Sequence, residues 1–334
     1  MQNITSLHPG NAADWQLELA NAITCADELL AELDLRHLAN ELVHKPAFRL
    51  LVPRGFAAKM QKGNADDPLL KQVLPMVAEN SPHGITDPVG DLDAMATPGL
   101  LHKYRGRALL VTTGACAIHC RYCFRRHFPY ANANPGKKEW GDAIAYLSAH
   151  EDVHEVILSG GDPLVLDNAK LGRLLNALEQ IPHIKWFRVH TRLPVVLPSR
   201  VDEELVALLH KLRLRKTFVI HANHANELGT DEYAALDKLQ SCGMTLLNQS
   251  VLLKGINDSS TALIDLSQSL YEAGVLPYYL HMLDPVQGAM HFDVSQPRAV
   301  ELIAALQKQL PGYLVPRLVR ENPGAASKTA IFTI

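Results

Sequence analysis

The 334-residue sequence has few cysteines, no excess of either charge and no long apolar run, and each shortage excludes a class of protein. Five cysteines are too few for a disulfide-built secreted scaffold. Lysine and arginine number 32 against 35 aspartates and glutamates, a formal charge of −3, which excludes a basic nucleic-acid coat protein. No stretch reaches the roughly 18 consecutive apolar residues of a membrane span. The first twenty residues show no basic patch followed by an apolar run, so no secretory signal is predicted.

What the sequence does contain is a large apolar fraction, 47% of its residues, which is enough for a sizeable buried core. A chain of this length is expected to form about two domains or one large α/β barrel. Because signals for secretion and membrane insertion are missing, the composition predicts a soluble, cytoplasmic globular protein.

From residue 108 onward, short β-branched runs alternate with helical patterns. The expected strands are 108–112, 155–159, 186–190, 217–221, 245–252 and 276–283, and the expected helices between them include 168–180, 203–212, 232–240 and 260–273. Such alternation is typical of parallel βαβ units with right-handed crossovers. About six such units predict an α/β barrel or partial barrel, with its active site at the carboxyl ends of the strands.

The regions on either side of this pattern differ from it. Residues 1–100 are predicted to form a mainly helical N-terminal extension that ends in a Pro-, Gly- and Asp-rich linker over 80–101. Residues 101–334 are predicted to form the barrel domain. Its last elements are expected to be a helix over 296–310, a short strand around 313–319 and a loop over 320–334.

Three of the five cysteines, Cys116, Cys120 and Cys123, form a C-x3-C-x2-C pattern directly after the first expected barrel strand. A structural zinc site usually has four ligands in two separated pairs, and His119 and His127 are the candidates to complete one here. Three thiolates on one loop suit instead a 4Fe–4S cluster that leaves one iron open to chelate a substrate or cofactor. The other two cysteines are isolated and are interpreted as core residues.

Two further motifs follow later in the sequence. Ser159, Gly160, Gly161 and Asp162 end the second expected strand, where a Gly-Gly pair by itself predicts only a turn. Lys328 lies in the small-residue segment PGAASKT, after the last expected strand. A lysine in that place is either an ordinary solvated loop residue or a residue that binds pyridoxal phosphate as a Schiff base.

The three-cysteine loop after the first strand, with an aromatic residue at Tyr122 and the glycine motif on the second strand, resembles the radical S-adenosylmethionine (SAM) superfamily. In that superfamily the open iron chelates the amino and carboxylate groups of SAM. One electron then cleaves the sulfonium to a 5′-deoxyadenosyl radical, and the glycine motif approaches the methionyl amino group. The resemblance implies a partial (βα)6 radical SAM barrel and places residues 159–162 in the cofactor-binding set.

Longer blocks are similar to one family within that superfamily, the lysine 2,3-aminomutases. The blocks are TPGLLHKYRGRALLVTTGACAIHCRYCFRR, VILSGGDPL, RLPVVLPSR, LLNQSVLLKGIND and PGAASKT, and they occur in family order from residue 97 onward. The family combines radical SAM chemistry with pyridoxal 5′-phosphate (PLP). The resemblance implies that Lys328 holds PLP as the catalytic lysine and that Lys103 and Arg107 bind its phosphate. Gln249 falls in the cofactor-binding set.

The same resemblance implies how a substrate is held. Arg125, the first arginine after the cluster loop, would grip the substrate's α-carboxylate. Two family aspartates bind the distal ammonium of lysine, and these positions are Asp284 and, as a conservative departure, Glu321. Because a buried ammonium needs acidic partners, this pair is expected to accept lysine and repel glutamate.

The chain departs from the longer members of the family, which bind zinc at a subunit contact. It ends six residues after Lys328 and has Leu236 where a partner cysteine would lie, so no zinc is expected. The short form resembles the bacterial branch that converts (S)-α-lysine to (R)-β-lysine for modification of translation elongation factor P. This implies L-lysine as substrate, an electron donor such as flavodoxin or ferredoxin, and a functional link to the ligase that attaches β-lysine to the factor. Neither a nucleic acid nor a membrane is expected as a partner.

Two other functions remain open at this point. One is another amino acid 2,3-aminomutase, for example one for glutamate, and the other is a non-catalytic iron–sulfur or zinc protein. The complete three-cysteine loop, the glycine motif and Lys328 favour an enzyme. His221 and His224 are either a separate metal site or, in the simpler interpretation, the polar lining of a pocket.

Overall fold

The computed structural model describes residues 13–43, 46, 48–133 and 140–332. The first twelve residues, for which the sequence predicts no secretory signal, lie outside the described residues. Among the helices of the described ranges, none is both long and apolar enough to cross a membrane.

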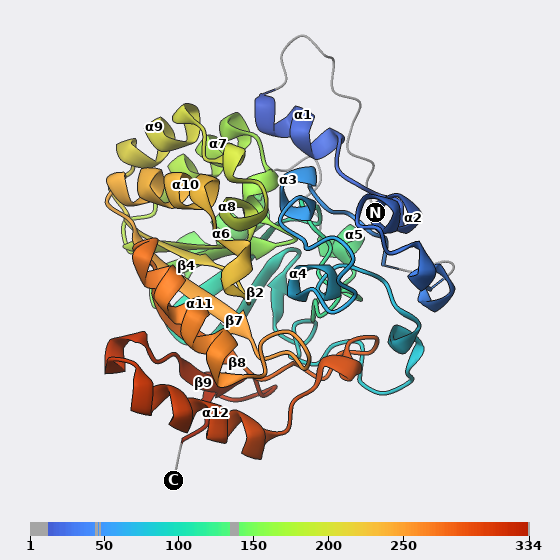
Figure 1. Ribbon diagram of the computed structural model, residues 1–334. Coiled ribbons are helices and arrows are strands. Elements are labelled where there is room, and N and C mark those ends of the chain that lie inside the picture. The colour runs from blue at the N-terminus through green and yellow to red at the C-terminus, as the bar shows by residue number, and fades with distance from the viewer. Residues whose placement is uncertain (1–12, 44–45, 47, 134–139, 333–334) are drawn as a thin grey trace.

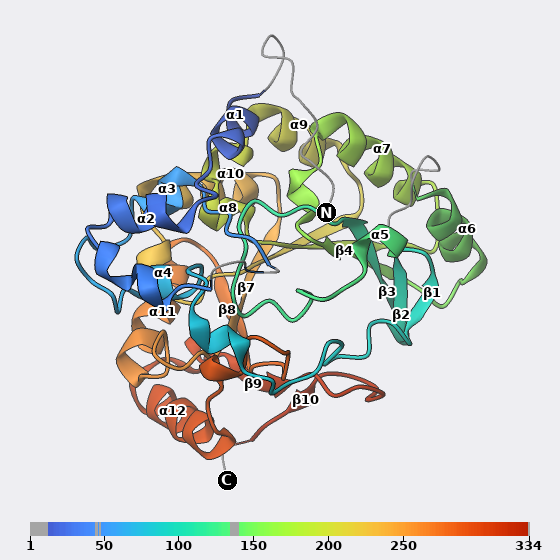
Figure 2. The same cartoon turned by 90° about the vertical axis from the view of Figure 1, so that its right-hand side faces the viewer.

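A ten-stranded sheet, counted over the described residues, forms the centre of the fold, and its strands are neighbours in sequence order. They are β1 (Met95–Thr97), β2 (Leu100–Tyr104), β3 (Arg107–Thr113), β4 (Glu155–Gly160), β5 (Trp186–Thr191), β6 (Arg215–Ile220), β7 (Thr245–Val251), β8 (Leu276–His281), β9 (Arg317–Arg320) and β10 (Thr329–Ala330). Strands β3 to β9 are parallel, and antiparallel strands flank them on both sides. The sheet curves on itself (Figure 2), and because its edge strands in the described residues, β1 and β10, do not pair with each other, the barrel is open. This confirms the predicted α/β partial barrel, with β9 as a further parallel strand.

Helices cover the outer face of the curved sheet (Figure 1). The barrel helices are α6 (Gly141–Ala149), α7 (Asn168–Glu179), α8 (Leu193–Val196), α9 (Glu203–Lys211), α10 (Thr230–Ser241), α11 (Ser260–Glu272) and α12 (Gln296–Gln309), and a short α5 (Tyr130–Ala133) follows the cysteine loop. Asp167, Asp202, Ser259 and Ser295 begin four of them by accepting a hydrogen bond from a first-turn backbone N–H. Such side-chain caps explain why these helices start close to their predicted positions.

The predicted linker over 80–101 is wrong in its second half. Pro98 and Gly99 form the turn of a β1–β2 hairpin, and Gly99 has the positive φ, 80°, that a type II turn requires at this position. The Pro-Gly pair therefore joins two strands rather than marking a flexible tether. Earlier in the same segment, Ile85 bridges to Val286, which fastens the segment to the loop after β8.

The C-terminal region also differs from its prediction. Gly312–Leu314 form a 3-10 turn, so the strand expected around 313–319 starts only at Arg317. The segment expected to be a loop contains β10, whose Thr329 pairs with Arg320 of β9. This hairpin turns the chain back on itself and places Lys328 beside Glu321.

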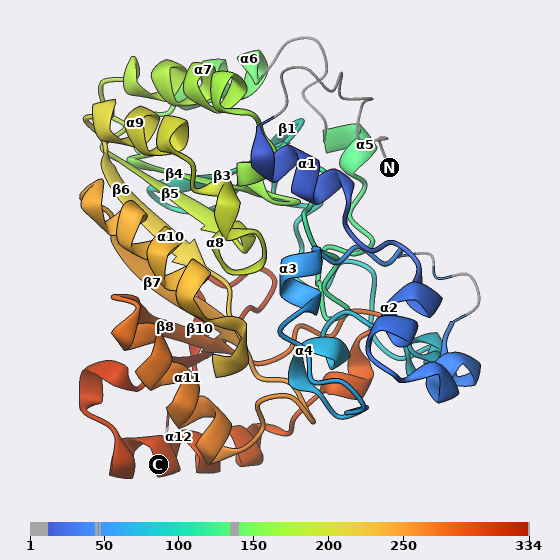
Figure 3. The same cartoon turned by 45° about the horizontal axis from the view of Figure 1, so that its top comes forward.

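The N-terminal extension lies across the loops at the carboxyl ends of the strands (Figure 3). It contains α1 (Asp14–Ala20), α2 (Ala26–Glu32), α3 (Arg54–Ala57) and α4 (Pro68–Lys71), and its apolar residues share one buried cluster with the barrel. Leu236 is part of that cluster. The predicted boundary between residues 100 and 101 falls within β2, and the division into two domains stays a prediction about chain organisation.

Candidate active site

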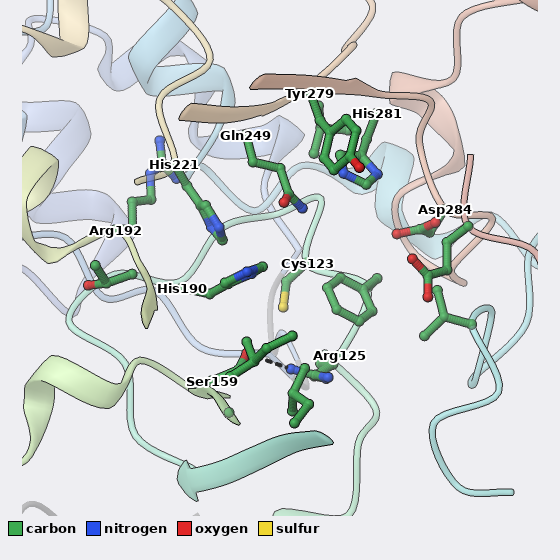
Figure 4. A pocket seen from close by; sticks show the side chains of 18 of the residues that line it. Cys123, Arg125, Ser159, His190, Arg192, His221, Gln249, Tyr279, His281 and Asp284 are labelled. Carbon is green, nitrogen blue, oxygen red and sulfur yellow. Dashed lines mark hydrogen bonds between the residues drawn. The ribbon is translucent and has the colours of Figure 1, made fainter. Parts of the chain in front are cut away.

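The loops at the carboxyl ends of the parallel strands enclose a cavity of about 560 Å³ (Figure 4). Every residue singled out in the sequence for the site lines it: Lys103, Arg107, Cys116, Cys120, Cys123, Arg125, Ser159, Gly160, Gly161, Asp162, Gln249, Asp284, Glu321 and Lys328. These residues are up to 225 positions apart in the chain. The cysteines and Asp284 meet there because the loops after successive parallel strands emerge at one end of the barrel. Lys103, Arg107 and Gln249 reach the same cavity from β2, β3 and β7.

The three cysteines lie on the loop between β3 and α5, and their thiols are free. Burial, reinforced by the neighbouring thiols, raises the pKa of Cys116 well above its usual value and that of Cys123 to about 11. These two thiols would therefore ionise only beside a strongly cationic group such as a metal. Within the described residues no three Cys, His, Asp or Glu side chains are grouped around one ion. Three free thiols on one loop are the donor set that a 4Fe–4S cluster takes.

The two histidines considered as zinc ligands have other contacts. The His119 Nδ1 atom lies 2.8 Å from the carbonyl oxygen of Arg49, and the His127 Nε2 atom lies 3.0 Å from that of Gln287. The ring nitrogen that donates to the carbonyl cannot bind a metal at the same time, and the other nitrogen of each ring stays available. The rings are thus anchored to neighbouring backbone.

The glycine motif holds the end of β4 directly against the start of the cysteine loop. Backbone N–H groups of Gly161 and Asp162 donate to the carbonyls of Thr113 and Ala115, at 2.7 and 2.8 Å. A Cβ atom on Gly161 would lie 2.1 Å from the Ala115 carbonyl oxygen, and Gly160 has a φ of +127°. Only glycines allow this approach of two backbones, so the motif positions the cysteine loop.

Asp162 uses its carboxylate within the protein. It accepts hydrogen bonds from the Thr191 hydroxyl and from the backbone N–H groups of Arg192 and Leu164. Burial raises its pKa to about 6, although these donors act in the opposite direction. The carboxylate therefore holds the loop after β5 in place at the cavity wall.

A bridging aspartate that the sequence analysis missed organises the cations on one side of the cavity. Asp91 accepts from Arg125 Nε through Oδ2 and from Lys103 Nζ through Oδ1, both at 2.6 Å. Burial alone would raise the pKa of Asp91, but the two cations lower it. Arg125 also donates to Ser159 Oγ at 2.9 Å, the dashed contact in Figure 4. Nothing in the sequence distinguished Asp91 from the other acidic residues of the predicted linker.

The C-terminal hairpin supplies an amine and an acid to the same cavity. Lys328 Nζ lies 2.6 Å from Glu321 Oε2, and the Tyr104 hydroxyl donates to Glu321 Oε1 at 2.5 Å. Burial would raise the pKa of Glu321, but Lys328 and these hydrogen bonds lower it. The guanidinium of Arg107 lies 4.6 Å from the centre of the Tyr104 ring, as a cation–π pair.

Asp284 presents an unpaired acceptor to the cavity. Its Oδ1 atom is buried and has no hydrogen-bond partner among the described residues. Burial raises its pKa to about 7, and the nearby Glu321 carboxylate adds to the rise while Lys328 opposes it. A buried carboxylate oxygen without a partner is costly, and its place is explained by a ligand that donates to it.

Three histidines also face the cavity (Figure 4): His281, which is buried, and His190 and His221, which are partly buried. Burial lowers the pKa of each, that of His221 to about 4, so all three rings are neutral at pH 7. Their Nε2 atoms have no hydrogen-bond partner in the described part of the chain. His221 thus lines the pocket, whereas His224 caps a 3-10 turn by accepting from the Asn226 N–H. His190 and His281 were not singled out in the sequence. Their positions near the ends of β5 and β8 are the signal that could have identified them.

Residues 110–266 match the radical SAM superfamily, the class of enzyme that an open α/β barrel with this cysteine loop defines. An L-lysine 2,3-aminomutase of Escherichia coli (strain K12) is 47% identical over 99% of this chain and 98% of its own. The protein of that name from Haemophilus influenzae is 46% identical over 95% of both chains. Among solved structures, a radical SAM methyltransferase from Sphaerobacter thermophilus aligns with a TM-score of 0.45 at 16% identity, over 66% of this chain and 68% of that one. The chain belongs to the lysine 2,3-aminomutase family, which confirms the resemblance seen in its motifs.

Family membership makes the protein an isomerase that uses a 4Fe–4S cluster, SAM and PLP. The cavity fits these groups. Its volume of about 560 Å³ lies within the ~300–1,000 Å³ of typical ligand sites. The thiols on one loop suit the cluster, the Lys328 amine with the nearby cations suits an aldehyde-bearing phosphate, and the unpaired Nε2 and Oδ1 atoms suit polar ligands.

Proposed function

We propose that this chain is a lysine 2,3-aminomutase that moves the α-amino group of L-lysine to the β carbon. The observation that carries the proposal is Asp284, which lines the same cavity as Glu321, Lys328 and the cysteine loop. Its buried Oδ1 atom has no hydrogen-bond partner in the part of the chain that the structure describes. The distal ammonium of lysine supplies the donor that this oxygen lacks. A distal carboxylate would instead meet two acidic groups out of water, which is strongly unfavourable.

The contact of Glu321 with Lys328 supports the same assignment. The Glu321 carboxylate already accepts from one ammonium group, at 2.6 Å. The position therefore suits a cation, and the Tyr104 hydroxyl holds the carboxylate in orientation from its other oxygen. We assign Asp284 and Glu321 together to the distal ammonium of the substrate.

The other end of the substrate is assigned to Arg125. Asp91 and Ser159 fix its guanidinium through Nε and Nη1, and the remaining N–H groups suit the α-carboxylate. A lysine molecule held at both ends presents its α and β carbons at a defined place between the two anchors. Such positioning is the main contribution that a protein makes to a rearrangement of this kind.

The remaining residues are assigned to the cofactors. Cys116, Cys120 and Cys123 hold the cluster, residues 159–162 and Gln249 contact SAM, Lys328 binds PLP, and Lys103 and Arg107 face its phosphate. When bound, the cluster and SAM supply one-electron chemistry at carbon, and PLP supplies a conjugated system that lets an amino group migrate. The N-terminal extension covers the loops around the cavity, which favours exclusion of water from the reacting groups.

The test uses anaerobically reconstituted protein, incubated with SAM, a reductant and either lysine or glutamate, with the products separated by chiral chromatography. We expect β-lysine from lysine, no β-glutamate, and no product from the Lys328→Ala variant. Comparable turnover of glutamate and lysine would overturn the substrate assignment and leave the cluster and PLP assignments standing.

We further propose that the product is (R)-β-lysine, that a flavodoxin or ferredoxin donates the electron, and that a ligase attaches the product to elongation factor P in the cytoplasm. The similarity to the short bacterial branch supports this, and the free thiols of the described cysteines suit a reducing compartment. The mass of elongation factor P from cells with and without the gene tests the link. An unchanged mass would refute it.

A further inference from the structure

A buried arginine touches one of the three thiols. Arg192, which directly follows β5, donates from Nη1 to the Cys120 sulfur at 2.8 Å. Its Nη2 atom donates to Glu227 Oε2 at 2.8 Å and to Gln72 Oε1 at 2.7 Å. The side chain is 5% exposed, so this guanidinium charge lies out of water and directly against a sulfur.

Two separate segments, the turn after β6 and the N-terminal extension, hold the guanidinium in this place. Glu227 ends a 3-10 turn after β6, is completely buried, and accepts from Gln72 Nε2 at 3.0 Å and from the Asn223 backbone N–H at 2.8 Å. Gln72 comes from the N-terminal extension and also accepts from Asn223 Nδ2. A network whose members have several partners each keeps a side chain in one rotamer. The network therefore holds Arg192 in the rotamer that contacts Cys120.

We propose that Arg192 is a positioning residue that donates a charged hydrogen bond to the Cys120 thiolate of the 4Fe–4S cluster and thereby raises the reduction potential of that cluster. In the step concerned, the [4Fe–4S]²⁺ cluster accepts one electron from an external low-potential donor and becomes [4Fe–4S]⁺. No bond is made or broken and no proton moves. The added negative charge spreads onto the sulfurs, so a cationic N–H donor stabilises the reduced form more than the oxidised form.

Glu227 sets the size of the effect. Its carboxylate accepts from Nη2 of the guanidinium, whereas Cys120 accepts from Nη1, and its negative charge opposes the field of Arg192 at the cluster. Removing the Glu227 charge alone should therefore raise the potential, whereas removing the N–H···S contact should lower it. A residue that served only packing would not produce shifts of opposite sign.

The experiment measures the midpoint potential of the cluster in the full-length, anaerobically reconstituted protein by redox titration followed by electron paramagnetic resonance. The variants are Glu227→Gln, Arg192→Lys and the double variant Arg192→Gln/Glu227→Gln, which leaves no buried charge unpaired. For Glu227→Gln we expect a midpoint potential higher than that of the unmodified protein. For the double variant we expect at least a tenfold less favourable reduction, equal to a fall of about 59 mV for a one-electron couple. Arg192→Lys should lie between the double variant and the unmodified protein.

Arg200→Gln is the matched control. This arginine is also completely buried, but its Nε and Nη2 atoms donate to the carbonyls of Leu164 and Leu166 instead of to a sulfur. The midpoint potential of the cluster in Arg200→Gln should equal that of the unmodified protein. Unchanged potentials in iron-replete Arg192 variants would overturn the proposal, as would shifts of one sign in all variants. Failure of every Arg192 variant to bind iron would assign the residue a structural role and overturn the proposal too. Lysine is absent from the titration, so the result is independent of the proposed substrate.

Discussion

Replacing Asp284 by asparagine is expected to stabilise the ligand-free protein while weakening its affinity for lysine. The Oδ1 atom is buried without a partner among the described residues, and burial raises the pKa of the group from 3.8 to about 7. Asparagine has nearly the same shape but carries no charge, so the cost of burying the ionised carboxylate disappears. The difference between the two pKa values corresponds to roughly 4 kcal/mol of folding free energy.

The stabilisation should depend on pH in a defined direction. Because the pKa of Asp284 is raised on folding, the folded protein binds more protons than the unfolded chain between about pH 4 and pH 7. The free energy of unfolding of the unmodified protein therefore falls as pH rises through that window. Asp284→Asn lacks this loss, so its advantage should be absent below about pH 4 and approach roughly 4 kcal/mol at about pH 8.

Lysine binding should change in the opposite sense. Removing a carboxylate that faces a buried ammonium costs about 2–5 kcal/mol, as for other truncated charge pairs. This corresponds to roughly a 30-fold to 5,000-fold loss of affinity. Urea unfolding of the ligand-free protein at several pH values and the KM for lysine measure the two effects, with iron content and PLP attachment as controls. An Asp284→Asn variant that is no more stable at pH 8, or that binds lysine normally, would refute the reasoning.

Substitutions at three further positions test the other parts of the site. Lys328→Ala should abolish borohydride-reducible attachment of PLP while the iron content stays unchanged, and attachment at another lysine would contradict this. Gly161→Ala should destabilise the cysteine loop by about 1–3 kcal/mol or more and reduce iron loading, because its Cβ atom would lie 2.1 Å from the Ala115 carbonyl oxygen. Normal iron content in Gly161→Ala would contradict this, because it would show that the cysteine loop can shift to accommodate the added methyl group. Glu321→Asp should keep kcat/KM for lysine within about tenfold, since it keeps a carboxylate at this position, whereas Glu321→Gln should lose more than that.

The alternation of strands and helices was predictable because it depends on local patterns. Runs such as 108–112 and 155–159 are apolar and β-branched, and they became β3 and β4 with bounds shifted by one residue at most at either end. The cysteine spacing and the glycine motif are equally local, and together they indicate the superfamily without any knowledge of tertiary contacts. The family followed from the order of longer blocks, which the comparisons confirm.

The wrong predictions concern segments whose structure depends on distant partners. Pro98 and Gly99 predict a turn, but only the pairing of β2 with β3 makes that turn part of a hairpin. In the same way, the segment after Arg320 contains no strand signal. Thr329 becomes part of β10 because β9 offers an unpaired edge.

The sequence by itself determined which chemical groups this protein has: three thiols on one loop, a lysine near the end of the chain and two acids for a distal ammonium. The tertiary structure decided what those groups contact. Asp91 between Arg125 and Lys103, the unpaired oxygen of Asp284 and the contact of Arg192 with a thiol each depend on segments that lie far apart in the chain. The physical reason is that burial and hydrogen-bond partners are properties of the packed chain, and they set the pKa and orientation of a side chain whose type alone leaves both undetermined.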